Sequence, residues 1–280
     1  MSSYLEKIGR IRAHLALEGA AGAVLSTPDN VFYATGFSSV MDGWHLVEPI
    51  AAVFVPTDAA SPVILILPEA SVISPIVSER GGHPVYFDRL ATFDMLNFCE
   101  TARAEDAHLA LPDDLLAELG DVMEQVEGQC EPDIIQTIAA SLSRHVAKGE
   151  RVLFDDLRVA ARVEALTGQA SGDALDVMFA ARAVKTADEL DTLRESGQIA
   201  DAIMAYTISQ LGVGKSWSEV EKQVAHFMID HDVDPLPGSP MLFGGAYDLV
   251  FRPDLFRTPV SLPFEGGEIA ILETQGRYKN

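Results

Sequence analysis

The sequence predicts an α/β protein with two domains. Through the first 170 or so residues, segments with helical spacing of apolar residues alternate with short continuous apolar runs, as in a sheet covered by helices on both faces. After about residue 180 the pattern changes to two long helices and then a region rich in proline and glycine. The length of 280 residues suits two domains of ordinary size. We expect a first domain over residues 1–172 and a second over residues 180–280.

The first domain opens with a predicted helix over 4–18, whose apolar residues recur at helical spacing until Gly19 ends it. The elements that follow alternate in type. We expect strands at the apolar runs 21–25, 51–55, 63–67, 83–87 and 151–155, and helices at the periodic segments 31–34, 69–79, 115–126, 134–146 and 159–166.

Polar residues mark the ends of several of these elements. The loop Ser26–Asn30 follows the first strand and contains a proline and capping residue types. Two acidic pairs, Asp113–Asp114 and Asp155–Asp156, each lie beside a strand end or a helix start. Carboxylates at helix starts accept hydrogen bonds from exposed backbone N–H groups, so we interpret both pairs as capping residues.

The second domain begins with two helices that carry capping boxes. Thr186 and Glu189 predict the start of a helix that reaches Leu211, and Ser216 and Glu219 predict a helix from Trp217 to about Asp230. Loop material follows, then a strand over 268–273 and a final extended piece over 274–280. No later segment remains to pair with that final piece, so we expect a second domain that is incomplete or is completed by another chain.

The composition excludes several classes of protein. A hydrophobic share of 48% and a charged share of 22% are ordinary for a globular chain and exclude a disordered or collagen-like one. The chain has 20 Lys and Arg against 42 Asp and Glu, a formal net charge of −22. Such a chain repels phosphate backbones, so we expect no nucleic-acid partner.

The sequence also predicts where the protein resides. Two cysteines, Cys99 and Cys130, suit a reducing compartment better than a disulfide framework. Glu6 and Lys7 stand where a signal peptide needs its apolar core. The densest apolar run, 63–67, is far shorter than the ~20 residues that span a membrane. We therefore expect a soluble cytoplasmic protein without a membrane partner.

Self-contained catalytic motifs are absent from the sequence, which has no P-loop, no His-Glu-x-x-His, no Cys-x-x-Cys and no nucleophile elbow. Two places remain of interest. Trp44 and His45 fall on a glycine-bearing loop, where they either bind a ligand or cover the domain's own core. Glu273 ends an apolar strand, where a carboxylate turns to solvent, binds a metal or pairs with a base.

Four segments of the chain resemble the creatinase, prolidase and aminopeptidase P family, the pita-bread metallopeptidases. They are an opening over 12–37 that includes Ser-Thr-Pro-Asp-Asn-Val-Phe-Tyr-Ala-Thr-Gly-Phe, a junction over 182–201, a helix start over 216–221 and a strand over 267–273. The resemblance implies a creatinase-type N-terminal domain of ribonuclease-H-like shape, followed by a pita-bread catalytic domain that is incomplete at its C-terminus.

The resemblance also implies a pair of divalent metal ions, Mn, Co or Zn, held in the family by two Asp, one His and two Glu. Glu273 stands at the position of the first ligand, a carboxylate in place of the usual Asp. The second Asp would fall just after Asn280, and Phe256 and Arg257 stand near the place of the family's substrate-facing His. One carboxylate cannot hold a catalytic metal, so we expect these 280 residues alone to be inactive.

The function implied by the resemblance is metal-assisted hydrolysis of Xaa-Pro peptides or related small amides. Family members are commonly homodimers, in which Trp44 and His45 would form a lid over the partner's site. Two alternatives stay open. The chain is a non-catalytic relative that dimerises or binds a ligand, or it is a relative with metal-free C–N hydrolase or lyase chemistry.

Overall fold

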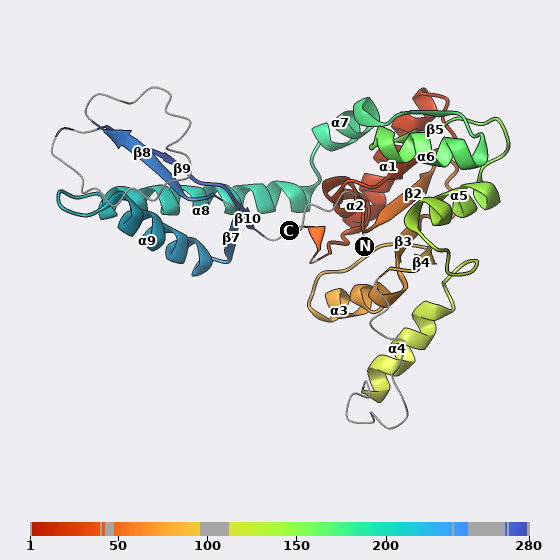
Figure 1. The fold of residues 1–280 in the computed structure, drawn as a ribbon, viewed down its shortest axis with the longest axis horizontal. Coiled ribbons are helices and arrows are strands. Elements are labelled where there is room, and N and C mark those ends of the chain that lie inside the picture. Colours follow the sequence, from red (N-terminus) through yellow and green to blue (C-terminus); the bar gives the residue numbers. More distant parts are fainter. Residues whose placement is uncertain are drawn as a thin grey trace. The chain divides into compact units, whose positions relative to one another are not determined.

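The computed structural model describes residues 2–39, 41–42, 48–95, 112–236, 238–245, 267 and 269–278. They belong to two compact units, Met1–Thr186 and Ala187–Asn280. Each unit has its own core and is described by itself (Figure 1).

The first unit is built on a sheet of six described strands in the order β4-β3-β2-β1-β5-β6. β1 lies inside the sheet, antiparallel to β2 and parallel to β5. The β2–β3 pair is antiparallel, and the β3–β4 and β5–β6 pairs are parallel. The strands are β1 Gly22–Leu25, β2 Ala52–Pro56, β3 Ile64–Pro68, β4 Arg89–Phe93, β5 Val152–Phe154 and β6 Ser171–Asp173.

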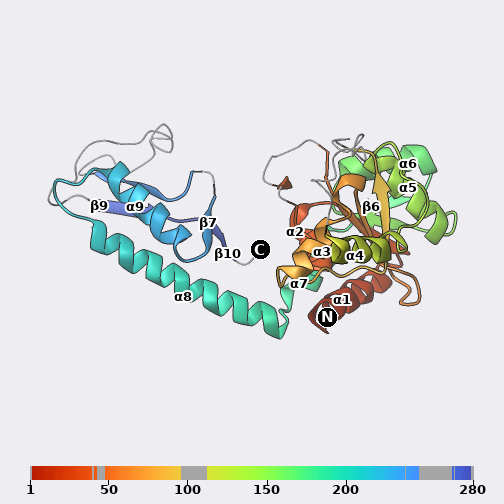
Figure 2. The same ribbon diagram turned by 90° about the horizontal axis from the view of Figure 1, so that it is seen from below.

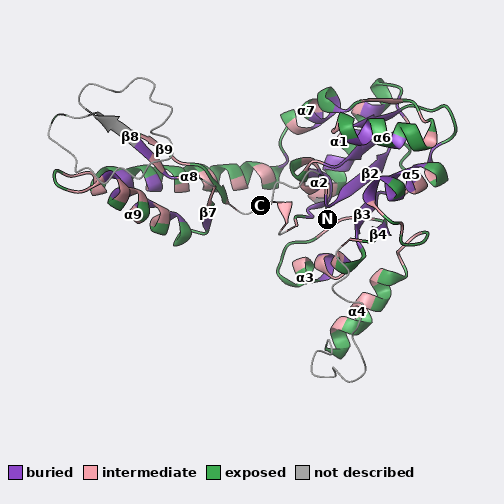
Figure 3. Cartoon of the chain, viewed as in Figure 1, coloured by how far each residue is buried: buried purple, intermediate pink, exposed green. Residues whose placement is uncertain are grey.

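Helices cover both faces of this sheet (Figures 1 and 2). α1 (Ser2–Leu17), α2 (Pro28–Thr35) and α7 (Leu175–Ala183) share one core with inward residues such as Ala23. α5 (Ile134–His145) and α6 (Leu157–Thr167) share the other core with its chain neighbour Val24. Successive strand residues point to opposite faces, so a strand that is covered on both faces must be apolar throughout. The inner strands are accordingly buried along their whole length (Figure 3).

The prediction for residues 83–87 was wrong. The strand in this part of the chain is β4, which begins at Arg89. Val85, Tyr86 and Phe87 pack against the first core from outside the sheet, and the Tyr86 N–H donates to the Thr35 carbonyl at the end of α2. The backbone of this segment is therefore bonded to a helix end instead of to β3.

The single helix predicted over 69–79 is two shorter pieces. A 3₁₀ turn occupies Glu69–Ser71, and α3 runs over Ser74–Arg80. Pro75 explains the break, because it has no N–H to continue a helix from the preceding turn. The helix predicted over 115–126 is confirmed as α4 (Asp113–Met123).

The first unit extends beyond residue 172, where the sequence placed its end. α7 lies within it, because Val177, Met178 and Ala181 join the core shared with α1. The Tyr33 hydroxyl on α2 donates to the Ala181 carbonyl at 2.9 Å, which ties α7 to α2 as well.

The second unit contains the two predicted long helices, α8 (Ala187–Gln210) and α9 (Trp217–Ile229). The capping box at Ser216 and Glu219 is confirmed, with both of its hydrogen bonds present. The strands are β7 Val233–Pro235, β8 Met241–Gly245, β9 Ile269–Glu273 and β10 Gly276–Tyr278. The core lies between helices and strands and includes Ile203, Trp217, Val220, Val224, Met228 and Leu242.

The expectation that the final extended piece has no partner was wrong. β10 pairs antiparallel with β7, with Tyr278 opposite Val233. β7 escaped prediction because it is only three residues long and ends at Pro235. Within the part of the chain that the structure describes, no helix has both the length and the apolar character that crossing a membrane requires.

Candidate functional site

Glu273 lies at the end of β9, on the hairpin-like pair that β9 forms with β8. The pairing puts Leu242 opposite Leu272 and Met241 opposite Glu273. Leu242 is buried and Leu272 packs against the same core, so this face of the pair is turned toward the helices. Ile271 and Glu273 alternate onto the other face and are exposed. The Glu273 Oε1 accepts a hydrogen bond from the Gln275 Nε2 at 2.7 Å.

Several residues singled out from the sequence lie outside the described residues. Trp44 and His45 belong to this group, as do Phe256, Arg257 and Cys99. Their roles stay predictions.

The described side chains do not make up a metal site. Among them no group of three or more His, Cys, Asp or Glu is placed to hold a metal ion. Glu273 contributes one carboxylate, which is engaged with an amide. A catalytic metal needs at least three protein ligands, so no chemical step can be derived through a metal from these residues.

A carboxylate on α9 anchors β8, and through it β9. The Glu221 Oε1 accepts from the Leu242 N–H at 3.0 Å. Burial raises the pKa of the Glu221 carboxyl above its ordinary value, against the opposing effect of the Leu242 N–H. On the same helix the Ser216 N–H donates to Glu219 at 2.8 Å and, with the Ser216 hydroxyl, holds the pKa of Glu219 below its ordinary value.

Glu221→Gln and Glu219→Gln are expected to change the pH dependence of stability in opposite directions. Raising a folded-state carboxyl pKa favours the protonated form, so Glu221 costs stability as pH rises above its unfolded pKa of ~4.3. Glutamine keeps an oxygen for the Leu242 N–H, so Glu221→Gln should become more stable than the parent between pH 4 and 7. Glu219 has a lowered pKa, and its contribution is present above the unfolded pKa and lost as pH falls through the folded one.

Urea unfolding of the second unit at pH 4 and pH 7 measures both effects. Glu219→Gln should be less stable than the parent at pH 7 and should approach it at low pH. The causes given for the two pKa shifts are contradicted by one result. In it, the difference in free energy of unfolding between variant and parent changes in the same direction for both variants as pH rises.

A second polar cluster lies at the carboxyl ends of β1 and β5. The Asp155 carboxylate follows β5 and accepts five hydrogen bonds, four from the loop after β1 and one from the first turn of α2. The donors are Ser26 N at 2.8 Å, Ser26 Oγ at 3.2 Å, Thr27 N at 3.1 Å, Thr27 Oγ1 at 2.6 Å and Asn30 Nδ2 at 3.0 Å. The Asn30 Oδ1 in turn accepts from Arg182 on α7 at 3.0 Å. One side chain thus joins two strand ends and α2.

The sequence predicted only part of this cluster. Asp156 caps α6 as expected, because its side chain accepts from the Arg158 N–H. Asp155 does not cap α6 and instead accepts hydrogen bonds from Ser26, Thr27 and Asn30. Each of the two segments can be recognised in the sequence, Asp155–Asp156 as an acidic pair and Ser26–Asn30 as a run that contains hydroxyl and amide residues. Their meeting depends on β1 and β5 being neighbours, which no local pattern shows.

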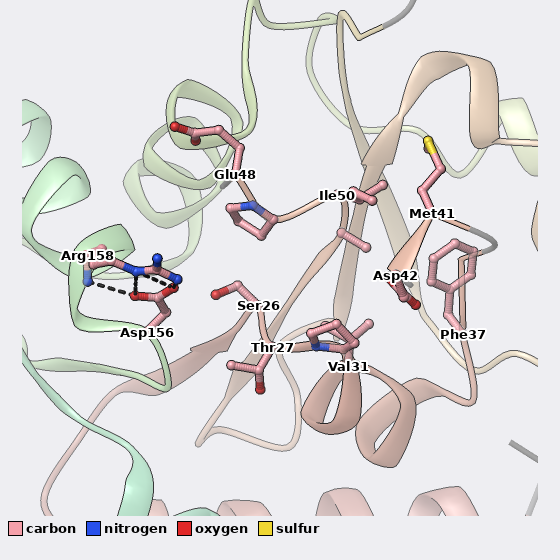
Figure 4. Close-up of a pocket in the computed structure, with 13 residues that line it drawn as sticks. Ser26, Thr27, Val31, Phe37, Met41, Asp42, Glu48, Ile50, Asp156 and Arg158 are labelled. Atoms are coloured by element: carbon pink, nitrogen blue, oxygen red, sulfur yellow. Dashed lines mark hydrogen bonds and ion pairs between the residues drawn. The ribbon is translucent and has the colours of Figure 1, made fainter. Parts of the chain in front are cut away.

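A cavity of about 210 Å³ opens beside this cluster. Figure 4 shows its lining side chains around one space, with Asp156 and Arg158 on one side and Phe37 and Asp42 on the other. The lining residues are Ser26, Thr27, Pro28, Val31, Phe37, Met41, Asp42, Glu48, Pro49, Ile50, Ala51, Asp156 and Arg158.

Comparison with known proteins places the fold. No family model matches the sequence, and the search of curated proteins found no match. Among solved structures, prolidase from Thermococcus sibiricus matches with a TM-score of 0.61 and 16% identity, over 99% of this chain and 62% of its own. Dipeptidase PepE from Mycobacterium ulcerans matches with a TM-score of 0.64 and 17% identity, over 99% of this chain and 61% of its own. X-Pro aminopeptidase from Thermotoga maritima matches with a TM-score of 0.61 and 11% identity, over 95% of this chain and 61% of its own.

These matches confirm the α/β fold and the resemblance to prolidases and X-Pro aminopeptidases at the level of the fold. The chain spans about three fifths of the length of these structures.

Proposed function

We propose that this chain is part of a metal-assisted hydrolase of the Xaa-Pro dipeptidase type, acting on small peptides or related small amides. The observation that carries the proposal is the shared fold, which extends over 99% of the chain in the match to the Thermococcus sibiricus prolidase. Sequence motifs from both units point in the same direction. The proposed metal is a divalent ion, Mn, Co or Zn.

The role proposed for this chain is to supply the N-terminal domain and the leading part of the catalytic domain. Glu273 would contribute one metal ligand from the face of β8 and β9 turned away from the helices. The remaining ligands would come from polypeptide outside these 280 residues. Hydrolysis is therefore proposed for the completed protein and not for this chain alone.

One observation favours a second candidate, a non-catalytic relative that dimerises or binds a ligand. The Glu273 carboxylate is exposed and already accepts a hydrogen bond from Gln275. A third candidate is a relative with metal-free C–N hydrolase or lyase chemistry. In each case we propose a homodimer in which Trp44 and His45 reach the partner's site.

Hydrolysis of a Xaa-Pro dipeptide with added Mn²⁺ or Co²⁺ tests the proposal. The test compares this chain with a form extended by the continuing reading frame. The chain alone should be inactive and the extended form active, and Glu273→Ala in the extended form should lower kcat about a hundredfold by removing a ligand. Gln275→Ala is the matched control, because it removes the partner of Glu273 and leaves the carboxylate.

Two results would contradict the proposal. One is an extended form that neither binds metal nor cleaves the dipeptide, which would favour the non-catalytic relative. The other is metal-independent activity that survives Glu273→Ala, which would favour the metal-free chemistry.

A further inference from the structure

The carboxyl ends of β1 and β5 meet in a crevice that has the topology of a ligand site. These two strands are adjacent and parallel. The helix after β1, α2, packs in the core on one face of the sheet, whereas the helix after β5, α6, packs in the core on the other face. Open α/β sheets bind ligands at such a topological switch point. The cavity of about 210 Å³ lies there, because Ser26 after β1 and Asp156 after β5 both line it.

The three acids that line the cavity are all engaged. Asp156 forms an ion pair with Arg158 at 2.6 Å, and the hydrogen bonds from Arg158 hold the pKa of Asp156 below its ordinary value. Both oxygens of Glu48 accept from Arg162 at 2.5 Å. Asp42 accepts a backbone N–H at 2.8 Å and makes a further interaction. An ion of either sign would have to compete with these partners.

The backbone N–H groups of the crevice are engaged as well. Those of Ser26 and Thr27 donate to Asp155, and that of Arg158 donates to its own ion-pair partner. Pro28, the first residue of α2, has no N–H. The anion that backbone groups usually hold at a switch point is therefore not matched here. An ion would also lose part of its hydration in the cavity, so the lining favours a neutral ligand.

The hydroxyl groups that line the cavity can only accept hydrogen bonds from a ligand. A hydroxyl has one proton. The protons of the Ser26 and Thr27 hydroxyls are donated to Asp155, at 3.2 and 2.6 Å. Their remaining lone pairs are acceptors, which a ligand matches with an N–H group.

The Arg158 side chain can donate to a ligand without leaving its ion pair. A guanidinium has five N–H donors. The Nε and Nη2 of Arg158 donate to Asp156, whereas Nη1 donates to no residue that the structure describes. The Nη1 protons therefore remain for a carbonyl oxygen. Figure 4 shows Arg158, Ser26 and Thr27 toward one end of the space and Phe37 toward the other.

Much of the remaining lining is apolar, and the cavity is small. Val31, Phe37, Ile50 and Ala51 are all buried and contribute carbon atoms. A cavity of about 210 Å³ is below the ~300 Å³ at which drug-sized sites begin. It therefore suits a molecule with a short branched apolar body and one polar head.

We propose that the crevice between β1 and β5 binds a small neutral carboxamide with an apolar body. A carboxamide has a carbonyl acceptor and an NH₂ group with two donors, and it carries no charge. Its carbonyl would accept from Arg158, its NH₂ group would donate to the hydroxyl oxygens of Ser26 and Thr27, and its body would pack on Val31 and Ile50. This site belongs to the first unit alone and does not rest on the proposed hydrolase function.

NMR titration of the 280-residue chain with four probes that share an isobutyl group tests the proposal. Isovaleramide has the proposed head, isobutyl methyl ketone keeps only the carbonyl, isovalerate is an anion and isoamylamine is a cation. At pH 7 isovaleramide should bind saturably and shift the amide resonances of Ser26, Thr27 and Arg158. The other three should bind at least about tenfold more weakly, because each leaves a donor or an acceptor of the site unmatched.

Two variants locate the polar head of the ligand. Arg158→Gln removes Nη1 and keeps a side-chain NH₂ group for Asp156, so it should weaken isovaleramide binding about tenfold. Arg194→Gln is the matched control, since Arg194 pairs with Asp191 at 2.6 Å on an exposed part of the second unit. It should change the affinity less than about twofold.

Three outcomes overturn the proposal. They are no saturable binding of isovaleramide, binding of any of the other three probes as tight as that of isovaleramide, and equal weakening by the two variants. Thermal melting of both variants accompanies the titrations. Weaker binding by Arg158→Gln supports the site when its melting shows that the variant is folded.

Discussion

Replacing Asp155 with alanine is expected to destabilise the first unit by about 3–5 kcal/mol, a large part of the total stability of a domain. The carboxylate accepts from two backbone N–H groups, two hydroxyls and one amide. Ser26 is only 5% exposed, so water cannot fully replace the lost acceptor there. A buried donor left without a partner costs about 1–3 kcal/mol.

Urea unfolding measures this effect, with Asp156→Ala as the control. Asp156 is the next residue and caps α6, so its loss should cost only about 1 kcal/mol. Asp155→Asn should fall between the two, since an amide keeps one acceptor oxygen. Equal losses for Asp155→Ala and Asp156→Ala would show that the five hydrogen bonds contribute no more than a helix cap.

Gly36→Ala is expected to cost the same unit about 3 kcal/mol or more, through backbone strain and a steric clash together. Gly36 ends α2 with a φ of +77°. A Cβ at this position would lie 2.7 Å from the carbonyl oxygen of Pro84 and 2.4 Å from the hydroxyl oxygen of Tyr4. The tyrosine ring can move, but the Pro84 carbonyl is part of the backbone.

Gly168→Ala separates the two causes. Gly168 ends α6 with a φ of +66°, and a Cβ there would meet nothing within 4 Å. This variant should show only the strain of the left-handed conformation, about 1 kcal/mol. The thermal midpoint and the urea midpoint should fall further for Gly36→Ala than for Gly168→Ala. Equal losses would mean that the surroundings of Gly36 yield freely to a methyl group.

The local elements of the fold were predictable because the sheet is covered on both faces. A strand such as β3 must then be apolar at every position, which marks it in the sequence. The short strands β6, β7 and β10 lack this signal, because they are three residues long and not fully buried. They form through pairing partners elsewhere in the chain, which local patterns do not contain.

The candidate sites were predictable to a lesser degree for the same reason. The position of Glu273 at a strand end could be predicted from residues 268–273 alone, but the face onto which it points follows from the β8 pairing. Asp155 has the residue type and place of a helix cap. Its actual partners lie at Ser26, Thr27 and Asn30, and only the parallel pairing of β1 with β5 brings them within reach.

The position of Asp155 in the chain sets the order in which the first unit can be completed. Its partners are made 125 to 129 residues earlier. As the protein leaves the ribosome, one edge of β1 therefore has no partner strand until β5 has been synthesised. Until then the backbone N–H groups of Ser26 and Thr27 also lack the Asp155 acceptor. Closing so long a loop is entropically costly and slow. Nascent chains halted before residue 155 should accordingly be the species that chaperones hold and proteases remove.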